Sequence, residues 1–254
     1  MRDITDSVRE GYNKTATAYH ESRINPTKTS FNAFVENPAL LRAAGYLQNR
    51  VILEAGCGSG IMSRKMKDLG ASVQAFDLSE EFIKIARKQN PDIAYEVASS
   101  ENLEKFYSPE SFDMVVSSLM IHYTNIDKSF NQMARVLKPN GKLVFSTAHP
   151  QSSAYQEKIG EIFRGEPIKL PSYFKDDKVS KWTMLNEKNK ALFTDMPFYV
   201  YNFEDMSKAL FENGFLIEQI YEPQAIDDPR CDPLVAKSSK RFPWFTVIRA
   251  TKAP

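Results

Sequence analysis

Three glycines alternate with other residues in the segment Glu54–Gly60, which reads Glu-Ala-Gly-Cys-Gly-Ser-Gly. The segment follows an apolar run typical of a buried strand, Val51–Leu53, and precedes a stretch with the apolar spacing of a helix. Glycines at such a junction let the backbone approach a ligand without an intervening side chain. The free amide groups at the start of the helix favour a carboxylate or a phosphate. The sequence therefore predicts a ligand-binding loop between a strand and a helix.

The spacing of these glycines helps to identify the ligand. The dinucleotide fingerprint requires Gly-x-Gly-x-x-Gly, because the fit of the pyrophosphate depends on those positions. In this chain the third glycine comes one residue early, at Gly60, and Ile61 occupies the fingerprint position. This departure disfavours an NAD-binding oxidoreductase, which stays open as an alternative.

The elements that position this loop follow from the alternation of apolar runs and amphipathic segments along residues 51–148. Five buried strands are predicted there: Val51–Leu53, Ser72–Phe76, Ile93–Val97, Phe112–Ser117 and Lys142–Thr147. Strands that alternate with helices form a parallel sheet covered on both faces. Two further strands, at Phe215–Tyr221 and Trp244–Ala250, bring this α/β sheet to seven mostly parallel strands.

We expect residues 1–254 to form a single domain with four parts. Residues 1–50 look mostly helical and form an N-terminal cap, and residues 51–148 form the binding core. Residues 149–200 break the rhythm with several prolines among charged and aromatic residues, so they are interpreted as an irregular lid or substrate insertion between strands 5 and 6. Residues 201–254 complete the sheet, with Asn202 as a helix cap.

The order of motifs along residues 50–148 resembles the class I S-adenosylmethionine (SAM)-dependent methyltransferases. The first motif of that family, an acid followed by Gly-x-Gly-x-Gly, matches Glu54 and the three glycines. Asp77 matches the acid that ends the second strand and accepts hydrogen bonds from ribose hydroxyls. Later landmarks also match: Phe112-Asp113, the run Ser117–Tyr123 and the turn Leu137–Gly141. The resemblance implies a Rossmann-like class I methyltransferase fold, with SAM as cofactor and S-adenosylhomocysteine as product.

Segments outside this core resemble the small-molecule branch of these enzymes, with a methyltransferase type 11-like domain. Tyr12–Tyr19 is similar to the N-terminal helix that closes over SAM in that branch. Ala148–Pro150 and Pro243–Ala250 are similar to parts of its C-terminal half. One departure is Ser99, which stands where the family has an aspartate before the adenine-side residue, so Ser99 or Ser100 is the expected adenine contact.

The resemblance implies three sets of site residues. The expected cofactor-binding residues are Tyr19, Glu54, Ala55, Gly56, Cys57, Gly58, Gly60, Asp77, Leu78, Ser99, Ser100, Glu101 and Ser117. The expected substrate-binding residues are aromatic side chains that can wall a pocket: Tyr12, Tyr123, Tyr173, Phe174, Trp182 and Tyr201. His122 and His149 follow the fourth and fifth strands and are candidates for a base or for orienting the substrate. The alternative for the tyrosines and histidines is a packing role, which is also expected of His20.

The expected reaction is in-line displacement of the methyl group of SAM by an oxygen or nitrogen atom of a small molecule. The cofactor carries the difficult chemistry, and the protein supplies binding and orientation. Cys57 would need a nearby base to act as a nucleophile, and the sequence supplies none, so a small apolar role is expected. The sequence shows no metal-ligand spacing, so no metal is expected.

Composition bounds the alternatives. The 33 Lys and Arg against 32 Asp and Glu give a formal net charge of +1, which argues against binding nucleic acid by charge alone. Methylation of a tRNA base or of a protein stays open, as does non-catalytic SAM binding. Two cysteines, no signal peptide and no apolar run of the roughly 20 residues that a bilayer requires favour a cytoplasmic protein without membrane contact. The oligomeric state is left open.

Overall fold

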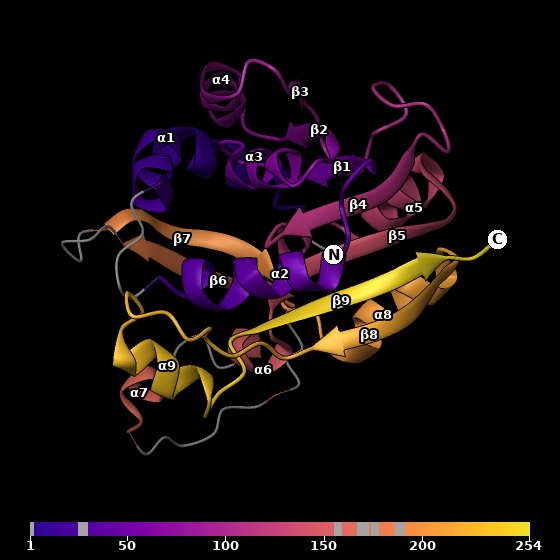
Figure 1. Ribbon diagram of the computed structural model, residues 1–254. Coiled ribbons are helices and arrows are strands. Elements are labelled where there is room, and N and C mark those ends of the chain that lie inside the picture. The colour runs from indigo at the N-terminus through magenta and orange to yellow at the C-terminus, as the bar shows by residue number, and fades with distance from the viewer. Residues whose placement is uncertain (1–2, 25–29, 155–158, 167–172, 174–177, 186–190) are drawn as a thin grey trace.

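The computed structural model describes residues 3–24, 30–154, 159–166, 173, 178–185 and 191–254 (Figure 1). Within these residues the main sheet has seven strands in the order β3-β2-β1-β4-β5-β9-β8. The strands are β1 (Val51–Ala55), β2 (Ser72–Asp77), β3 (Ala94–Val97), β4 (Phe112–Ser118), β5 (Leu137–Ala148), β8 (Phe215–Tyr221) and β9 (Phe245–Lys252). Strands β1 to β5 pair in parallel, and β9 runs antiparallel to both β5 and β8. The predicted seven-stranded, mostly parallel sheet is confirmed.

The strand order reverses at β1, with β2 and β3 on one side and β4 and β5 on the other. In an open α/β sheet the crevice outside the carboxyl ends of the strands at such a point is where ligands bind. Ala55 at the end of β1 is in register with Phe76 of β2 and with Ser117 of β4. The loop after β1, the end of β2 and the segment after β4 therefore meet at one edge of the sheet.

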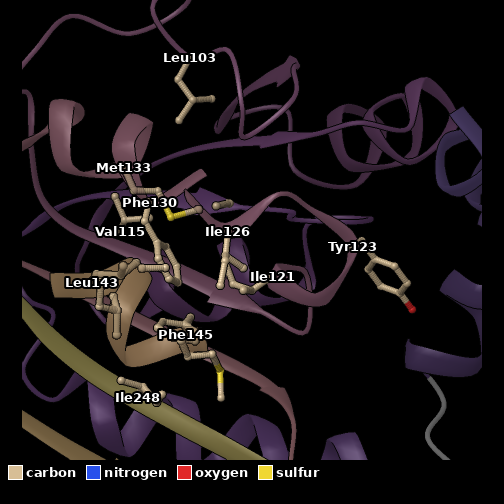
Figure 2. Close-up of a cluster of buried hydrophobic side chains, with 14 of the residues drawn as sticks. Leu103, Val115, Ile121, Tyr123, Ile126, Phe130, Met133, Leu143, Phe145 and Ile248 are labelled. Atoms are coloured by element: carbon tan, nitrogen blue, oxygen red, sulfur yellow. The ribbon is translucent and has the colours of Figure 1, made fainter. Parts of the chain in front are cut away.

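Helices cover both faces of the sheet, as expected. They are α2 (Asn37–Ala44), α3 (Ile61–Asp68) and α4 (Glu80–Gln89) on one face, and α5 (Ile126–Val136) and α8 (Phe203–Glu212) on the other. Consecutive residues of a strand point to opposite faces of the sheet. Ile52 therefore packs into a first buried cluster, beneath α2, α3 and α4, and Leu53 packs into a second, beneath α5 and α8. Figure 2 shows the second cluster, in which Phe130 and Met133 of α5 pack near Phe145 of β5. None of the helices in the described ranges combines the length and apolar character needed to cross a membrane.

The described residues of the N-terminal part, 1–50, are mostly helical, as predicted. They include α1 (Thr5–Ile24) and a π-helical turn, η1 (Asn32–Glu36), which runs directly into α2. Figure 1 shows α1 between α4 and the β6–β7 pair, and residues of α1 contact both. The N-terminal cap therefore lies over the carboxyl edge of the sheet.

Polar side chains cap the starts of two helices, and one of them is the cap predicted at Asn202. Ser79 Oγ accepts a hydrogen bond from the Phe82 amide, 3.2 Å away, at the start of α4. Asn202 Oδ1 accepts one from the Asp205 amide at 2.8 Å, and Asp205 returns the bond to the Asn202 amide. Each bond satisfies one of the free amides in the first turn of its helix.

The prediction of an irregular segment at residues 149–200 was wrong in part. The described residues form α6 (Pro150–Ala154), α7 (Ile159–Arg164) and an antiparallel pair, β6 (Val179–Leu185) and β7 (Ala191–Tyr199), separate from the main sheet. Pro197 lies within β7, opposite Lys181. Each strand of a two-stranded sheet has an outer edge where proline removes no ladder bond, so proline did not exclude a strand here.

The predicted turn at residues 138–141 belongs instead to the first part of β5. Asn140 takes a left-handed φ of 62°, and the pairing of β4 with β5 shifts register between Phe112 and Met114. The residues that were expected to form a turn therefore produce an irregularity in the pairing of β4 with β5. The remaining short elements are η2 (Ile121–Tyr123) after β4 and α9 (Pro233–Ser239) before β9.

Candidate functional site

A cavity of about 1360 Å³ opens at the carboxyl edge of the sheet, where the strand order reverses. Its walls come from the loop after β1, the ends of β2 and β3, the segment after β4, helix α1 and the β6–β7 pair. Single-ligand pockets usually measure about 300–1,000 Å³. The cavity is therefore large enough for a nucleoside-sized molecule and a second one beside it.

The glycine loop is held by backbone bonds that turn it around the end of β2. The amides of Gly56 and Cys57 both donate to the carbonyl of Phe76, at 2.9 Å each. Gly58 has a φ of 52°, and a side chain placed on it would meet no atom within 4 Å. Gly58 therefore borders open space in the cavity, which is the close backbone approach that the sequence predicts.

Asp77 connects this loop to the end of β2. Its Oδ2 accepts a hydrogen bond from the Gly58 amide at 2.8 Å, and its Oδ1 accepts one from the Ser79 amide at 2.9 Å. Burial raises the pKa of Asp77 to about 6, against the lowering effect of these amides. The carboxylate lines the cavity, and each oxygen keeps a lone pair for a second donor. A pair of ribose hydroxyls fits this acceptor set.

Glu54 lies at the inner end of the loop and lines the cavity, although only 1% of its surface is exposed. Ser63 of α3 donates a hydrogen bond to its Oε2. Burial raises the pKa of Glu54 to about 8, and the Asp77 carboxylate adds to this rise. A buried carboxyl of this kind accepts a positively charged group readily, because the cation offsets the cost of burying the negative charge.

The segment after β3 forms another wall, through Ser99, Ser100 and Glu101. Ser100 Oγ shares a hydrogen bond with Ser129 Oγ at 2.8 Å, and Glu101 Oε1 accepts one from the Asn125 amide at 2.9 Å. Ser99 Oγ accepts a bond from the Glu101 amide at 3.2 Å, and a hydroxyl so bound can still donate its proton. Ser99 is therefore the better placed of the two serines to contact a base.

Aromatic rings close the cavity from the side of α1. The ring centroid of Tyr12 lies 6.0 Å from that of Tyr19, 5.7 Å from that of Phe82 and 5.5 Å from that of Tyr123. Trp182 of β6 donates its indole N–H to the Tyr123 hydroxyl at 2.8 Å. Burial raises the pKa of both Tyr12 and Tyr123, so both stay neutral. Tyr12, Tyr19 and Tyr123, which the sequence assigned to the site, thus form one continuous wall with the β6–β7 pair.

The three histidines occupy different environments. His122 lines the cavity, and its Nδ1 shares a hydrogen bond with Thr147 Oγ1 at 3.0 Å. Burial lowers the pKa of His122 to about 3, so the ring is neutral near pH 7. His20, expected to be structural, is buried and bonds Ser59 Oγ at 2.8 Å.

His149 lies behind the wall of the cavity. Its Nδ1 accepts from the Gln151 amide at 3.1 Å, and its Nε2 lies 3.0 Å from Glu222 Oε1. Burial lowers its pKa, while Glu222 opposes that shift. Both ring nitrogens are therefore used by the protein, and the structure does not bring His149 to the cavity lining.

Several other predicted site residues do not line the cavity. Ala55, Gly60 and Ser117 are each next in sequence to a lining residue but do not line the cavity themselves. Ser117 Oγ is buried without a hydrogen-bond partner in the described structure. The Tyr201 hydroxyl instead donates to the Thr124 carbonyl at 2.8 Å. Tyr173 is not among the lining residues, and Phe174 lies outside the described residues.

The cavity also contains residues that the sequence analysis did not select. Met120 covers Gly56, so that a side chain on this glycine would meet Met120 Cγ at 2.5 Å. Arg23 lies over the ring of Tyr19, 5.1 Å from its centroid, and Ser118 follows Ser117 at the end of β4. Ser118 and Met120 lie in the Ser117–Tyr123 run that the sequence did single out. Arg23 carried no local signal, because it reaches the site only through the docking of α1.

The residues present fit SAM. Asp77 offers a paired acceptor of the kind that ribose hydroxyls require, Leu78 and Ser99 line the cavity, and Gly58 leaves room beside the loop. The buried carboxyl of Glu54 suits a positively charged group such as the amino group of SAM. Cys57 is buried, and its burial raises the pKa of the thiol, so it does not serve as a thiolate. Among the described residues no group of three or more His, Cys, Asp or Glu side chains is arranged to hold a metal ion.

The fold and the site define a Rossmann-like α/β protein with a nucleoside cavity, and comparison with known proteins agrees. Residues 53–145 match the family model described as a methyltransferase domain. A ubiquinone biosynthesis O-methyltransferase of Thiobacillus denitrificans is 32% identical over 127 residues, which are 47% of this chain and 54% of that protein. The chain spans about half the length of the curated relatives it matches.

Solved structures extend the likeness to most of the fold. A SAM-dependent methyltransferase of Mesorhizobium loti is 26% identical, with a TM-score of 0.62 over 84% of this chain and 96% of that one. A candidate SAM-dependent methyltransferase of Listeria monocytogenes shares the fold, with a TM-score of 0.72, 24% identity, and coverage of 86% and 97% of the two chains. Residues 53–145 therefore match a methyltransferase domain, and the fold around them is similar to that of SAM-dependent methyltransferases.

Proposed function

We propose that the protein transfers the methyl group of SAM to an oxygen or nitrogen atom of a small molecule. The observation that carries this proposal is the cavity of about 1360 Å³, which extends from the glycine loop to the aromatic wall. That volume exceeds the usual range for one ligand, so a cofactor and a small acceptor fit together. The name of the Thiobacillus denitrificans relative, an O-methyltransferase, supports an oxygen acceptor.

SAM supplies an electrophilic methyl group, and the protein's own residues bind and orient the two reactants. Glu54, Gly58 and Asp77 hold the cofactor from the sheet side. Tyr12, Tyr123 and Trp182 exclude water and hold the acceptor from the opposite side. Holding the reacting atoms about 3–3.5 Å apart contributes several kcal/mol to the lowering of the barrier.

His122 acts in this proposal as a neutral partner that orients the acceptor. Its pKa of about 3 means that protonating the ring costs free energy, so it is a weak base in this site. Its Nδ1 is fixed by Thr147, which leaves the orientation of the ring defined. His149 contributes by fixing the start of α6 beside the cavity, because its Nδ1 accepts the Gln151 amide.

The experiment is to incubate the protein with methyl-labelled SAM and an extract of its source cells, and then to separate the label by molecular size. Label in the small-molecule fraction supports the proposal and yields a product to identify. Label in RNA or protein contradicts it and favours the macromolecular alternative. Binding of S-adenosylhomocysteine without any transfer favours a non-catalytic SAM-binding protein.

We also propose a cytoplasmic location. Cys57 and Cys231 are free thiols, which suits a reducing compartment. Immunodetection after separation of soluble and membrane fractions tests this part of the proposal, and recovery of the protein in the membrane or secreted fraction contradicts it.

A further inference from the structure

Glu36 is a buried carboxyl that the binding of the cofactor does not use. It is 0% exposed and ends the π-helical turn η1. Its Oε1 accepts hydrogen bonds from Ser118 Oγ at 2.9 Å and from Ser146 Oγ. Its Oε2 has no hydrogen-bond partner among the described residues. Burying an acid with a free oxygen is costly, so this arrangement calls for an explanation beyond packing.

Ser118 connects this carboxyl to the cavity. Ser118 lines the cavity wall at the end of β4, and the preceding residue, Ser117, is in register with Ala55 just before the glycine loop. Because Ser118 donates its own proton to Glu36, the lone pairs of its oxygen are free to accept a proton from a molecule in the cavity. A hydrogen-bonded path therefore runs from the cavity through Ser118 to Glu36.

The local backbone supports a functional placement. Glu36 is carried by a π-helical turn, a conformation that is rare and is often found at functional sites. The same turn places Asn32, Ala33 and Phe34 on the cavity wall. It thus brings a segment of the N-terminal cap to the ends of β4 and β5, where Ser118 and Ser146 lie.

The charges around Glu36 suit a group that exchanges a proton. Burial raises its pKa, while the hydroxyls of Ser146 and Ser118 and the charges of Arg23 from α1 and Lys65 from α3 lower it. The charge of Glu36 in turn raises the pKa of Glu54 on β1. The net direction is upward, and a carboxylate with a raised pKa is a better general base at neutral pH than an ordinary one.

We propose that Glu36 is the final proton acceptor for a methyl acceptor that carries a hydroxyl group, and that Ser118 passes the proton to it. The inference rests on the proposed methyl transfer and adds the class of acceptor. The acceptor oxygen forms its bond to the methyl carbon as the bond from that carbon to sulfur breaks, with the electron pair going to sulfur. The hydroxyl proton moves to Ser118 Oγ, the Ser118 proton moves to Glu36 Oε1, and Glu36 later releases a proton to solvent.

The test compares Glu36→Gln, Ser118→Ala and the double variant with the wild type in forming the labelled small-molecule product from cell extract, between about pH 6 and pH 9. Glutamine keeps an oxygen that accepts from both serines but cannot take a proton, so it preserves the packing role. We expect each single variant to lose at least about 100-fold in rate, since general bases contribute roughly 10²–10⁴-fold. The double variant should lose no more than the singles, because residues that act as a unit are not additive.

Ser146→Ala is the matched control, since Ser146 contacts the same Glu36 oxygen but does not line the cavity. It should lose much less than Ser118→Ala. At saturating SAM, where the pH dependence of cofactor binding does not contribute, the wild-type rate should rise with pH as Glu36 ionises, and this dependence should vanish in Glu36→Gln. Calorimetric binding of S-adenosylhomocysteine at about pH 9, where Glu54 is ionised with or without the Glu36 charge, should be unchanged in both variants, which shows that their cofactor site is folded.

A Glu36→Gln variant that keeps the wild-type rate and pH profile overturns the inference but leaves methyl transfer intact. A wild-type protein that labels no small molecule overturns the proposed function itself. A third measurement needs no acceptor: ¹³C NMR of the Glu36 carboxyl in the complex with S-adenosylhomocysteine, assigned by its loss in Glu36→Gln. A carboxyl that titrates above its usual range and is ionised by about pH 9 supports the inference, and one that stays protonated throughout overturns it.

Discussion

The two halves of the cavity are built in different ways. The half proposed to bind SAM, called the cofactor half, comes from residues 54–101, and its main contacts are backbone amides that bond the Phe76 carbonyl and the Asp77 carboxylate. The half proposed to bind the methyl acceptor, called the acceptor half, is assembled from α1, η1, the segment after β4 and the β6–β7 pair, and it is made mostly of side chains. The first half depends on local backbone geometry and the second on how distant segments dock. A change in one half should therefore leave a signature that the other half does not share.

The largest effect is expected at Asp77, whose carboxylate accepts a hydrogen bond from the glycine loop and is proposed to accept others from the ribose of the cofactor. Asp77→Asn should weaken binding of S-adenosylhomocysteine by about 100-fold, because charged hydrogen bonds contribute roughly 1.5–3 kcal/mol each and an amide cannot accept on both sides. The measurement is isothermal titration calorimetry.

The matched control for this variant is Asp113→Asn. Asp113 accepts from the Val51 amide at 2.8 Å at the amino end of the same sheet, away from the cavity. Asp113→Asn should leave the affinity for S-adenosylhomocysteine unchanged. Equal losses in the two variants would mean that the Asp77 effect reports general destabilisation and not loss of a cofactor contact.

A tenfold effect is expected at Gly58. Gly58→Ala and Gly214→Ala place a side chain at φ values of 52° and 75°, with no atom within 4 Å of either new Cβ. Both should lower the free energy of unfolding by about 1–2 kcal/mol, from the strain of a left-handed alanine. Only Gly58→Ala should also weaken the binding of S-adenosylhomocysteine by about tenfold, because the new methyl group enters the part of the cavity proposed to hold the ligand. Urea unfolding and calorimetry separate the two effects, and equal affinities would show that the ligand does not approach Gly58.

The same contrast explains how far the sequence predicts the structure. The seven strands and the glycine loop followed from local rules, because apolar periodicity and glycine spacing are each encoded within a few residues. Asp77 was assigned through the resemblance, and it lines the cavity. Glu54, Tyr12 and Tyr123 were found through the resemblance, and the structure brings all three to the cavity.

Most of the features that the sequence analysis did not predict lie in the acceptor half of the cavity. Arg23 and Glu36 enter the site through the docking of α1 and η1, and nothing in their immediate sequence distinguishes them from surface residues. His149 was selected for its position after a strand, but the start of α6 and Glu222 occupy both its nitrogens. The β6–β7 pair was missed because proline was weighted against strands, although β7 tolerates Pro197 on an open edge.

A smaller effect concerns the pH dependence of cofactor binding. Unliganded Glu54 has a pKa of about 8, so at pH 7 it is mostly protonated. An ammonium group beside it lowers that pKa, so binding at pH 7 should release close to one proton. The affinity for S-adenosylhomocysteine should then rise about fivefold from pH 7 to pH 8 and level off above that.

The proton release is measured by calorimetry in two buffers of different ionisation enthalpy. Glu54→Gln should abolish it, together with the pH dependence between pH 7 and pH 8. Binding at pH 7 without proton release would show that the Glu54 carboxyl does not meet the amino group of the ligand.

The smallest effect is expected in the acceptor half, at the bond that ties the β6–β7 pair to the cavity. Trp182→Phe removes the indole N–H that donates to the Tyr123 hydroxyl at 2.8 Å, which should cost about 1 kcal/mol of unfolding free energy. Lys181→Ala is the neighbouring control, since Lys181 is exposed and, within the described part of the chain, pairs with Asp195 at 3.8 Å, a contact worth about 0–1 kcal/mol. Trp182→Phe should raise the KM of the acceptor a few-fold and leave S-adenosylhomocysteine affinity unchanged, because the bond orders one wall only. A change in cofactor affinity instead would mean that the two halves are coupled through Tyr123, whose ring contacts the Tyr12 ring, and that the separation between them does not extend to α1.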